Sequence, residues 1–296
     1  AMQSAEFLSA VFFYLKVGEN LNQNWIVENL NNAFSTWNGK LGELWGLVTT
    51  GPQTFKGGAV WSVMQTLHNG MVGIGYALVV LFFAISLCKN TMNFHELKRP
   101  EAAIHYFLRF VAAKTLVGYG MDIMLNVFSI CNGIVTDMAD SMGGISEAMV
   151  SLPAEMQTAI ENVGFLASIP LWLVTILGSL FITVLSFVMI LTVYGRFFRL
   201  YMYTALAPLP LAAFAGESTQ SVGISFLKSY VGVCLEGAVI VLACVIYSAF
   251  VSTPTVASGE ATTIVWSYLA ETVFNMLVLV GLIKGSDRII HEMMGL

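Results

Sequence analysis

The chain has 296 residues, of which 57% are hydrophobic and 10% are charged, and its formal net charge is −5. In soluble domains about a quarter of the residues are charged, so this composition excludes a soluble globular protein and indicates a polytopic membrane protein. It gives no support for a broad basic surface that binds nucleic acid.

The cysteines lie within or beside apolar stretches and show no metal-like spacing. They are Cys88, Cys131, Cys234 and Cys244. This pattern favours neither a disulfide framework nor a zinc site, so we interpret the four as small hydrophobic side chains.

Residues 1–67 are of mixed polarity, and their large apolar side chains recur in steps of three and four from Ile26 to Val48. Such spacing predicts a helix with one apolar face. We expect an external amphipathic N-terminal region at 1–67, ahead of a transmembrane helical domain at 68–296. The predicted helix either lies on a membrane leaflet or packs on the bundle or on a neighbouring copy of the chain.

Five later stretches are apolar enough to cross a membrane and are long enough, since a crossing takes roughly 20 helical residues. They are residues 68–88, 110–135, 165–194, 229–251 and 264–284. The predicted fold is therefore all-α: a polytopic helical membrane protein with about five transmembrane helices.

The loops between these stretches differ in charge. Residues 89–101 carry Lys98 and Arg99, and Arg109 and Lys114 follow shortly, whereas residues 136–163 carry five acids and no Lys or Arg. Basic residues concentrate on the cytoplasmic side, which predicts an external N-terminus and a cytoplasmic C-terminus. We interpret Arg109 and Lys114 as inner-face basic residues that snorkel toward the headgroups.

Residues 196–216, RFFRLYMYTALAPLPLAAFAG, form an apolar stretch interrupted by Pro208 and Pro210. Arg196 and Arg199 place its start on the cytoplasmic side, and the next crossing must begin there too, so residues 200–215 must enter and leave on one face. Each proline removes a backbone donor. We therefore expect an unwound re-entrant or interfacial segment, either at the cytoplasmic mouth of a conduit or as a structural elbow.

Ionisable residues inside membrane helices are costly and rare. Asp122 and Glu236 lie within predicted crossings, and Glu271 with Asn275 forms one polar face of the last crossing. We expect these side chains to face protein or water rather than lipid. They either line a conduit or make polar contacts inside the bundle.

Motifs for chemistry are missing from the sequence. It has no G-x-x-x-x-G-K-[ST], no H-E-x-x-H and no G-x-S-x-G, so nucleotide hydrolysis and two common kinds of hydrolase site are not indicated. We predict that the chain is not an enzyme and holds no catalytic, cofactor-binding or metal site.

Several features together resemble the TrbL-type membrane subunit of bacterial conjugative type IV secretion systems. These are the external N-terminal region, the five crossings, the acidic external loop, and Arg196-x-x-Arg199 followed by Ala207-Pro208-Leu209-Pro210. The resemblance implies a ring-forming, multi-pass inner-membrane component that supports pilus assembly and the export of single-stranded DNA with its bound relaxase. Its implied partners are membrane lipids, other secretion-system subunits and separate ATPases.

A different class of function also fits the buried acids. In a secondary transporter or small-solute channel, Asp122, Glu236 and Glu271 would couple protons or bind a substrate. No inverted half-repeat, which many such transporters contain, is found in the sequence.

Overall fold

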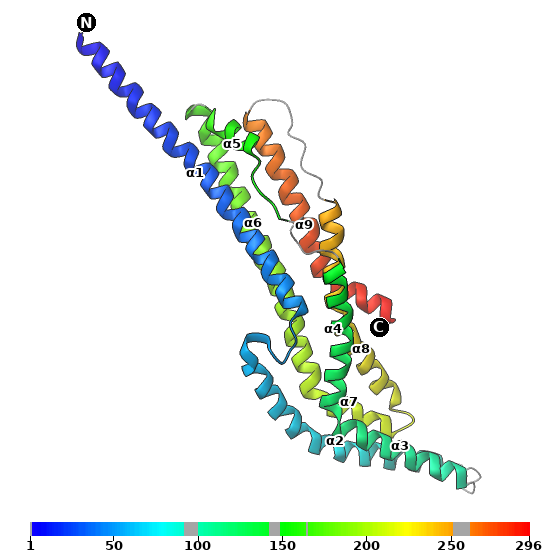
Figure 1. Ribbon diagram of the computed structural model, residues 1–296. Helices are drawn as coiled ribbons and strands as arrows, with labels where there is room; N and C mark the ends of the chain where they lie inside the picture. The colour runs from blue at the N-terminus through cyan, green and yellow to red at the C-terminus, as the bar shows by residue number, and fades with distance from the viewer. Residues whose placement is uncertain (1, 92–99, 142–148, 164, 251–260) are drawn as a thin grey trace. The chain divides into compact units, whose positions relative to one another are not determined.

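A computed structural model describes residues 2–91, 100–141, 149–163, 165–250 and 261–296, with side chains from residue 25 onward apart from those next to the gaps. The described residues form helices and turns with no β-strand (Figure 1), which confirms the all-α prediction. The helices are α1 (Met2–Thr49), α2 (Ala59–Thr91), α3 (Pro100–Gly118), α4 (Gly120–Ser141), α5 (Ala154–Glu161), α6 (Phe165–Leu206), α7 (Pro208–Ala212), α8 (Gln220–Phe250) and α9 (Ala261–Met294).

In the described part of the chain, four helical segments are long and apolar enough to cross a membrane. They are Phe55–Lys89, Ile169–Leu206, Gln220–Ala249 and Thr263–Met294. These segments confirm a polytopic membrane protein and correspond to four of the five predicted crossings.

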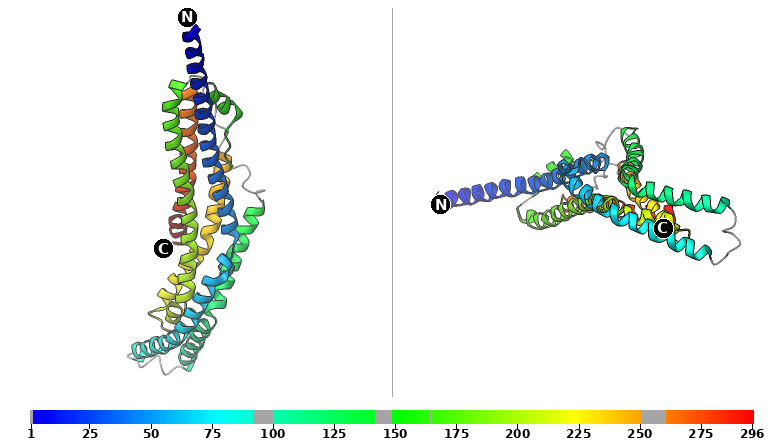
Figure 2. Two further views of the ribbon diagram at one scale, coloured as in Figure 1. Left: turned by 90° about the vertical axis from the view of Figure 1, so that its left-hand side faces the viewer. Right: turned by 90° about the horizontal axis from the view of Figure 1, so that it is seen from below.

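The remaining predicted crossing, 110–135, is not one helix. It is divided between α3 and α4 at Tyr119, and Figures 1 and 2 show the two helix axes diverging there. Tyr119 stands between Gly118 and Gly120, two residues of low helix propensity. Gly120 is also a site of close packing, where an added Cβ would lie 3.2 Å from Leu211. The prediction of a single continuous helix is therefore wrong.

The chain divides into two compact units. Unit 1 comprises Ala1–Trp45, Gly143–Thr192 and Leu242–Lys284, and unit 2 comprises Gly46–Met142, Val193–Val241 and Gly285–Leu296.

In unit 1, the apolar face of α1 is buried against the chain's own helices. Ile26, Leu30 and Trp37 are inaccessible to solvent. The Phe34 ring meets Tyr268 of α9 edge to face, and the Asn38 side chain exchanges two hydrogen bonds with the backbone of Val150. This part of α1 therefore packs on the protein itself, one of the alternatives that the sequence left open.

In unit 2, α2 and α3 lie side by side, and α7 with the following 3₁₀ turn η3 (Ala213–Ala215) packs against both (Figures 1 and 2). The contact is close at Gly75 of α2, where an added Cβ would lie 2.9 Å from both the Pro208 carbonyl oxygen and a Val117 methyl group. Small residues allow backbones to approach in this way. The proline segment is thus a buried packing element of unit 2.

The proline segment is also helical, contrary to the unwound conformation expected for residues 200–215. Helix α6 continues through Arg196 and Arg199 to Leu206, and α7 follows a single turn residue, Ala207. Pro208 occupies the first position of α7, where a helix needs no backbone donor. A proline at a helix start restarts the helix rather than unwinding it.

The missing donor of Pro208 is replaced from another helix. In a continuous helix the amide of residue 208 would donate to the carbonyl of Thr204, four residues earlier. That carbonyl oxygen instead lies 2.7 Å from Nδ1 of the buried His68 of α2. Because a carbonyl can only accept, His68 must carry its proton on Nδ1.

The turn between α1 and α2 depends on backbone with positive φ. In the 3₁₀ turn η1 (Phe55–Gly58), φ is 47° at Lys56, 73° at Gly57 and 78° at Gly58. A Cβ at residue 58 would also lie 2.9 Å from the Gln53 carbonyl oxygen. Glycine at 57 and 58 makes this left-handed turn possible.

Candidate functional site

A group of charged side chains joins α6, α8 and α9 within unit 2. The Arg199 guanidinium donates to both carboxylate oxygens of Glu236 at 2.7 Å and forms a second ion pair with Asp287. The Ser286 hydroxyl donates to Glu236 at 3.1 Å. Glu236 is 1% exposed, so its charge is neutralised inside the protein rather than by water.

Arg196, one turn before Arg199 on α6, is completely buried. Its guanidinium donates to the carbonyl oxygens of Val233 at 3.3 Å, Cys234 at 3.1 Å and Val48 at 3.3 Å. Val48 lies in the last turn of α1, where carbonyls have no helical partner. Arg196 therefore links the end of α1 to the middle of α8.

The structure thus revises the interpretation of the arginine pair. Both residues lie inside α6 rather than after the end of a crossing, and Arg196 is buried against backbone carbonyls of α1 and α8. Glu236, predicted to line a conduit or to make polar contacts, is held by Arg199, and this arrangement fits the packing alternative.

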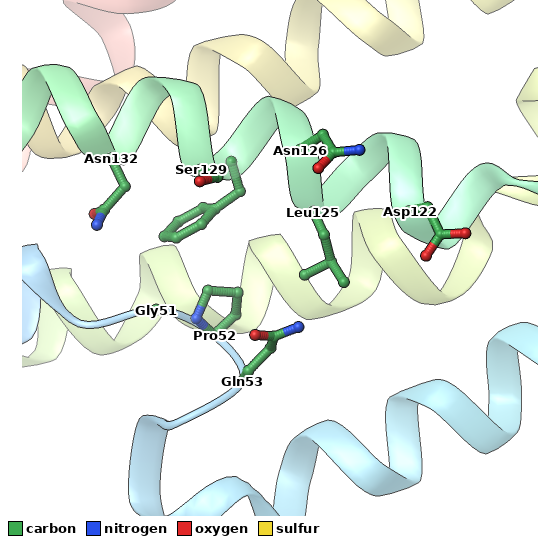
Figure 3. A pocket seen from close by; sticks show the side chains of 9 residues that line it. Gly51, Pro52, Gln53, Asp122, Leu125, Asn126, Ser129 and Asn132 are labelled. Atoms are coloured by element: carbon green, nitrogen blue, oxygen red, sulfur yellow. The ribbon is translucent and has the colours of Figure 1, made fainter.

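Asp122 and Asn126 have a different environment, because both are exposed on α4. With Ser129 and Asn132 they line a cavity of about 530 Å³ that is closed on its other side by the loop Gly51–Gln53 (Figure 3). Asp122 and Asn132 lie at opposite ends of the cavity lining along α4.

Helix α4 has two contrasting faces. The buried face is apolar: Met124, Phe128, Cys131, Val135 and Ala139. The exposed side carries Asp122, Asn126, Ser129, Asp137 and Asp140, which we call the α4 polar stripe, and beside them the apolar Ile130 and Ile134. The positions of the stripe recur in steps of three, four and eight, the spacing of one helical face, and α4 contains no basic residue.

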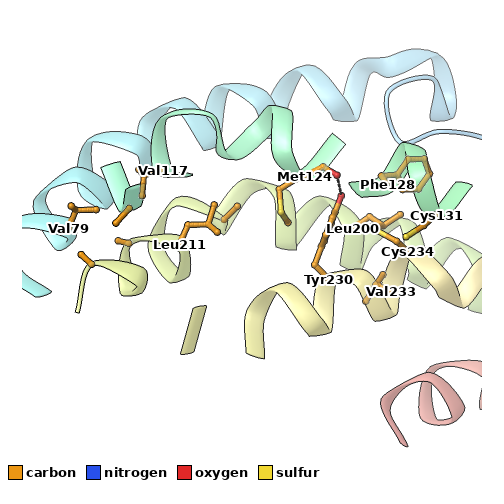
Figure 4. Packing of buried hydrophobic residues seen from close by; sticks show 14 residues of the cluster. Val79, Val117, Met124, Phe128, Cys131, Leu200, Leu211, Tyr230, Val233 and Cys234 are labelled. Atoms are coloured by element: carbon orange, nitrogen blue, oxygen red, sulfur yellow. Dashed lines mark hydrogen bonds between the residues drawn. The ribbon is translucent and has the colours of Figure 1, made fainter. Parts of the chain in front are cut away.

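Met124, Phe128 and Cys131 of the buried face pack in one core with residues of α8, which is one of the candidate crossings. Figure 4 shows this core, in which the Tyr230 hydroxyl of α8 donates to the Met124 carbonyl of α4 at 2.8 Å. The polar stripe is therefore carried by a helix that packs beside a membrane-crossing segment.

The other predicted residues lie in several places. Glu271 and Asn275 belong to unit 1, but Glu271 is exposed whereas Asn275 is buried, so they do not share one environment. Arg109 hydrogen-bonds to Gln220 at the start of α8, and Lys114 is exposed. Lys98 and Arg99 lie outside the described residues.

Sequence reasoning missed three residues that the structure shows to be important for this region. They are His68, Ser286 and Gly237, where an added Cβ would lie 2.8 Å from Nη1 of Arg196. None was singled out in the sequence, although a histidine within a predicted crossing is itself a signal. The roles of Ser286 and Gly237 depend on contacts between helices distant in sequence, so no local pattern indicates them.

The thiols are free, and three of them are buried as small hydrophobic side chains, as predicted. Cys131 of α4 and Cys234 of α8 lie side by side in the core shown in Figure 4. Cys244 is buried in unit 1, and Cys88, near the end of α2, is exposed.

Apolar helices of membrane-crossing length define a polytopic helical membrane protein, and the ion pair between Arg199 and Glu236 joins two of them. Residues 37–208 match the family model described as TrbL/VirB6 plasmid conjugal transfer like protein, and the chain belongs to that family. The resemblance seen in the sequence is thereby confirmed. Comparison with curated proteins finds no match. The family is one of membrane components of conjugal transfer and type IV secretion rather than a family of enzymes.

Proposed function

We propose that the protein is a channel or platform subunit of a conjugative type IV secretion system in the inner membrane. Several copies surround a passage, and the complex assists pilus assembly and the export of single-stranded DNA with bound relaxase. Separate ATPase subunits supply the energy. In this proposal the N-terminal region is external, the C-terminus is cytoplasmic, and lipids contact the apolar outer surface.

The observation that carries this proposal is the α4 polar stripe. Its first and last residues, Asp122 and Asp140, are eighteen positions apart, or about 27 Å at roughly 1.5 Å per residue. Asp on the lipid-facing side of a membrane helix costs roughly 2.5 to 3.5 kcal/mol at the helix centre. The stripe is therefore best accommodated against water or against another subunit, as expected for a helix that borders a passage.

The acidic character of the stripe bears on its role. The stripe contains three carboxylates and no positive charge, so it repels a polyanion such as DNA rather than binding it. In the proposed passage α4 forms part of the wall. Because its charge has the same sign as that of the cargo, the cargo passes without binding to it.

The proposal is tested by making the stripe apolar in cells that contain the complete secretion system. In the double variant Asn126→Leu and Asp137→Leu, the amount in the membrane should stay normal while DNA transfer to recipient cells falls by at least about tenfold. Ile130→Leu is the matched control, because Ile130 is also exposed on α4 but is apolar already. Normal transfer by the double variant would show that the stripe faces lipid or an inert surface, and the proposal would then be withdrawn.

A further inference from the structure

We propose that the cavity between α4 and the loop Gly51–Gln53 binds an organic ammonium cation with several N–H donors, for which a linear polyamine is the simplest ligand. This inference goes beyond the secretion function and does not depend on it. It rests on the charge, the hydrogen-bonding groups and the shape of the cavity.

The charge of the lining favours a cation. Asp122 is the one ionised group among the nine lining residues, all of which are described, and they include no Lys, Arg or His. A carboxylate accepts charge-assisted hydrogen bonds from ammonium groups. An anionic ligand would meet uncompensated repulsion at this end of the cavity.

Asn132, at the other end, has a side-chain acceptor with no donor among the described residues. Its Nδ2 donates to the Thr49 carbonyl oxygen at 3.2 Å, which fixes the orientation of the amide because a carbonyl can only accept. Its Oδ1 is buried and has no hydrogen-bond partner among the described residues. A buried acceptor without a donor is unfavourable, and a ligand N–H would satisfy it.

The shape of the cavity suits an extended ligand. Asp122 and Asn132 are ten residues apart on α4, about 15 Å at roughly 1.5 Å per residue, and the cavity has a volume of about 530 Å³. Asn126 and Ser129 offer further acceptors between these ends, and Leu125 points toward the loop side (Figure 3). A polyamine alternates ammonium groups with methylene segments, so it matches both the polar and the apolar parts of this lining.

The same ammonium chemistry has two sources. One is a free polyamine, and the other is a lysine side chain presented by a partner protein. Both place an N–H cation against Asp122 and Asn132, and the experiment distinguishes them.

The test titrates spermidine into the purified full-length protein in a non-ionic detergent at constant ionic strength, with heat of binding as the readout. We expect saturable binding that Asp122→Asn weakens by about tenfold or more and Asn132→Ala by several-fold, because each removes one acceptor. Asp140→Asn is the control. It removes a carboxylate from the same face of α4 but outside the cavity, and should leave the affinity within about twofold.

A photo-crosslinking side chain at Ser129 in intact cells identifies the source. A covalent adduct that peptide mapping places next to a lysine of another protein assigns the cation to a partner lysine, whereas saturable spermidine binding without an adduct assigns it to a free polyamine. Absence of saturable binding, or equal weakening by Asp122→Asn and Asp140→Asn, would overturn the proposal. Spermidine affinity and DNA transfer are measured separately on Asp122→Asn and Asp140→Asn, so a failure of the cavity proposal can be told from a failure of the secretion function.

Discussion

A methyl group added at Gly237 of α8 would lie 2.8 Å from Nη1 of Arg196, closer than Cβ atoms come to neighbours in folded proteins. The absence of a side chain at 237 creates the space in which the buried guanidinium reaches the carbonyl oxygens of Val233 and Cys234. The glycine and the arginine are therefore one packing unit, although they lie on different helices.

Gly237→Ala should consequently destabilise the protein, by about 1 to 3 kcal/mol, because overpacking forces a rigid, hydrogen-bonded group to move. Thermal unfolding of the purified protein in detergent measures the effect. Gly195→Ala is the matched control: residue 195 adjoins Arg196 on α6, no atom lies within 4 Å of its added Cβ, and Ala favours the helix by up to about 1 kcal/mol. Equal stability of the two variants would contradict the steric explanation.

The ion pair between Arg199 and Glu236 should show strong coupling. Removal of one partner leaves a charge without compensation, so Glu236→Gln and Arg199→Gln should each destabilise the protein by up to about 3 kcal/mol. Arg199 is partly exposed and keeps its contact with Asp287 when Glu236 is replaced. Glu236→Gln should therefore be the less costly of the two substitutions. In the double variant the cost should be clearly less than the sum of the single costs.

A double-mutant cycle on unfolding temperature checks this coupling, and DNA transfer is followed in parallel. If Glu236→Gln keeps normal stability and assembly but stops transfer, the carboxylate acts in passage rather than in packing. Additive costs in the cycle would mean that the observed ion pair contributes nothing measurable.

The His68 side chain should contribute to the stability of the fold mainly when residue 208 is proline. His68→Ala leaves the buried Thr204 carbonyl without a donor and should cost about 1 to 3 kcal/mol. Pro208→Ala supplies a backbone N–H for the same carbonyl, so in that background the His68 substitution should cost much less. Unfolding temperatures of the four proteins of this cycle give the comparison. If His68→Ala costs the same with proline and with alanine at 208, then His68 does not replace the backbone donor that Pro208 lacks.

The contact of α7 with α2 should be sensitive at Gly75. In Gly75→Ala the new Cβ would approach the Pro208 carbonyl oxygen, a backbone atom that cannot rotate away, so we expect a loss of about 1 to 3 kcal/mol and reduced DNA transfer. Gly73→Ala, two residues earlier on the same helix, meets no atom within 4 Å and should behave as the wild type. Transfer and stability equal to the control would show that α7 can shift without consequence.

Much of the fold could be predicted from hydrophobic periodicity alone. The apolar face of α1 from Ile26 onward and four of the crossings follow from the spacing and length of apolar runs, which depend only on neighbouring residues. The division of 110–135 at Tyr119 could not be predicted in this way, because mean hydropathy does not register two glycines around a turn.

The polar residues were harder to interpret for a related reason. Arg196 and Arg199 were placed after the end of a crossing because charged residues usually mark helix ends in membranes. The burial of Arg196 depends on carbonyls supplied by α1 and α8, and Glu236 depends on α6 and α9, contacts that no local window of sequence contains. Asp122, in contrast, was expected deep within a crossing and lies in the first turn of α4.

Because one thiol is exposed and three are buried, the native chain can be labelled selectively at a single cysteine. A maleimide dye should attach to Cys88 with a stoichiometry near one, because the other thiols are enclosed by packed side chains. Cys131 and Cys234 stand on α4 and α8 respectively, so a second equivalent of dye would be incorporated only when these helices separate. The labelling ratio thus becomes an intrinsic, mutation-free reporter of opening between the helix that carries the polar stripe and its neighbour.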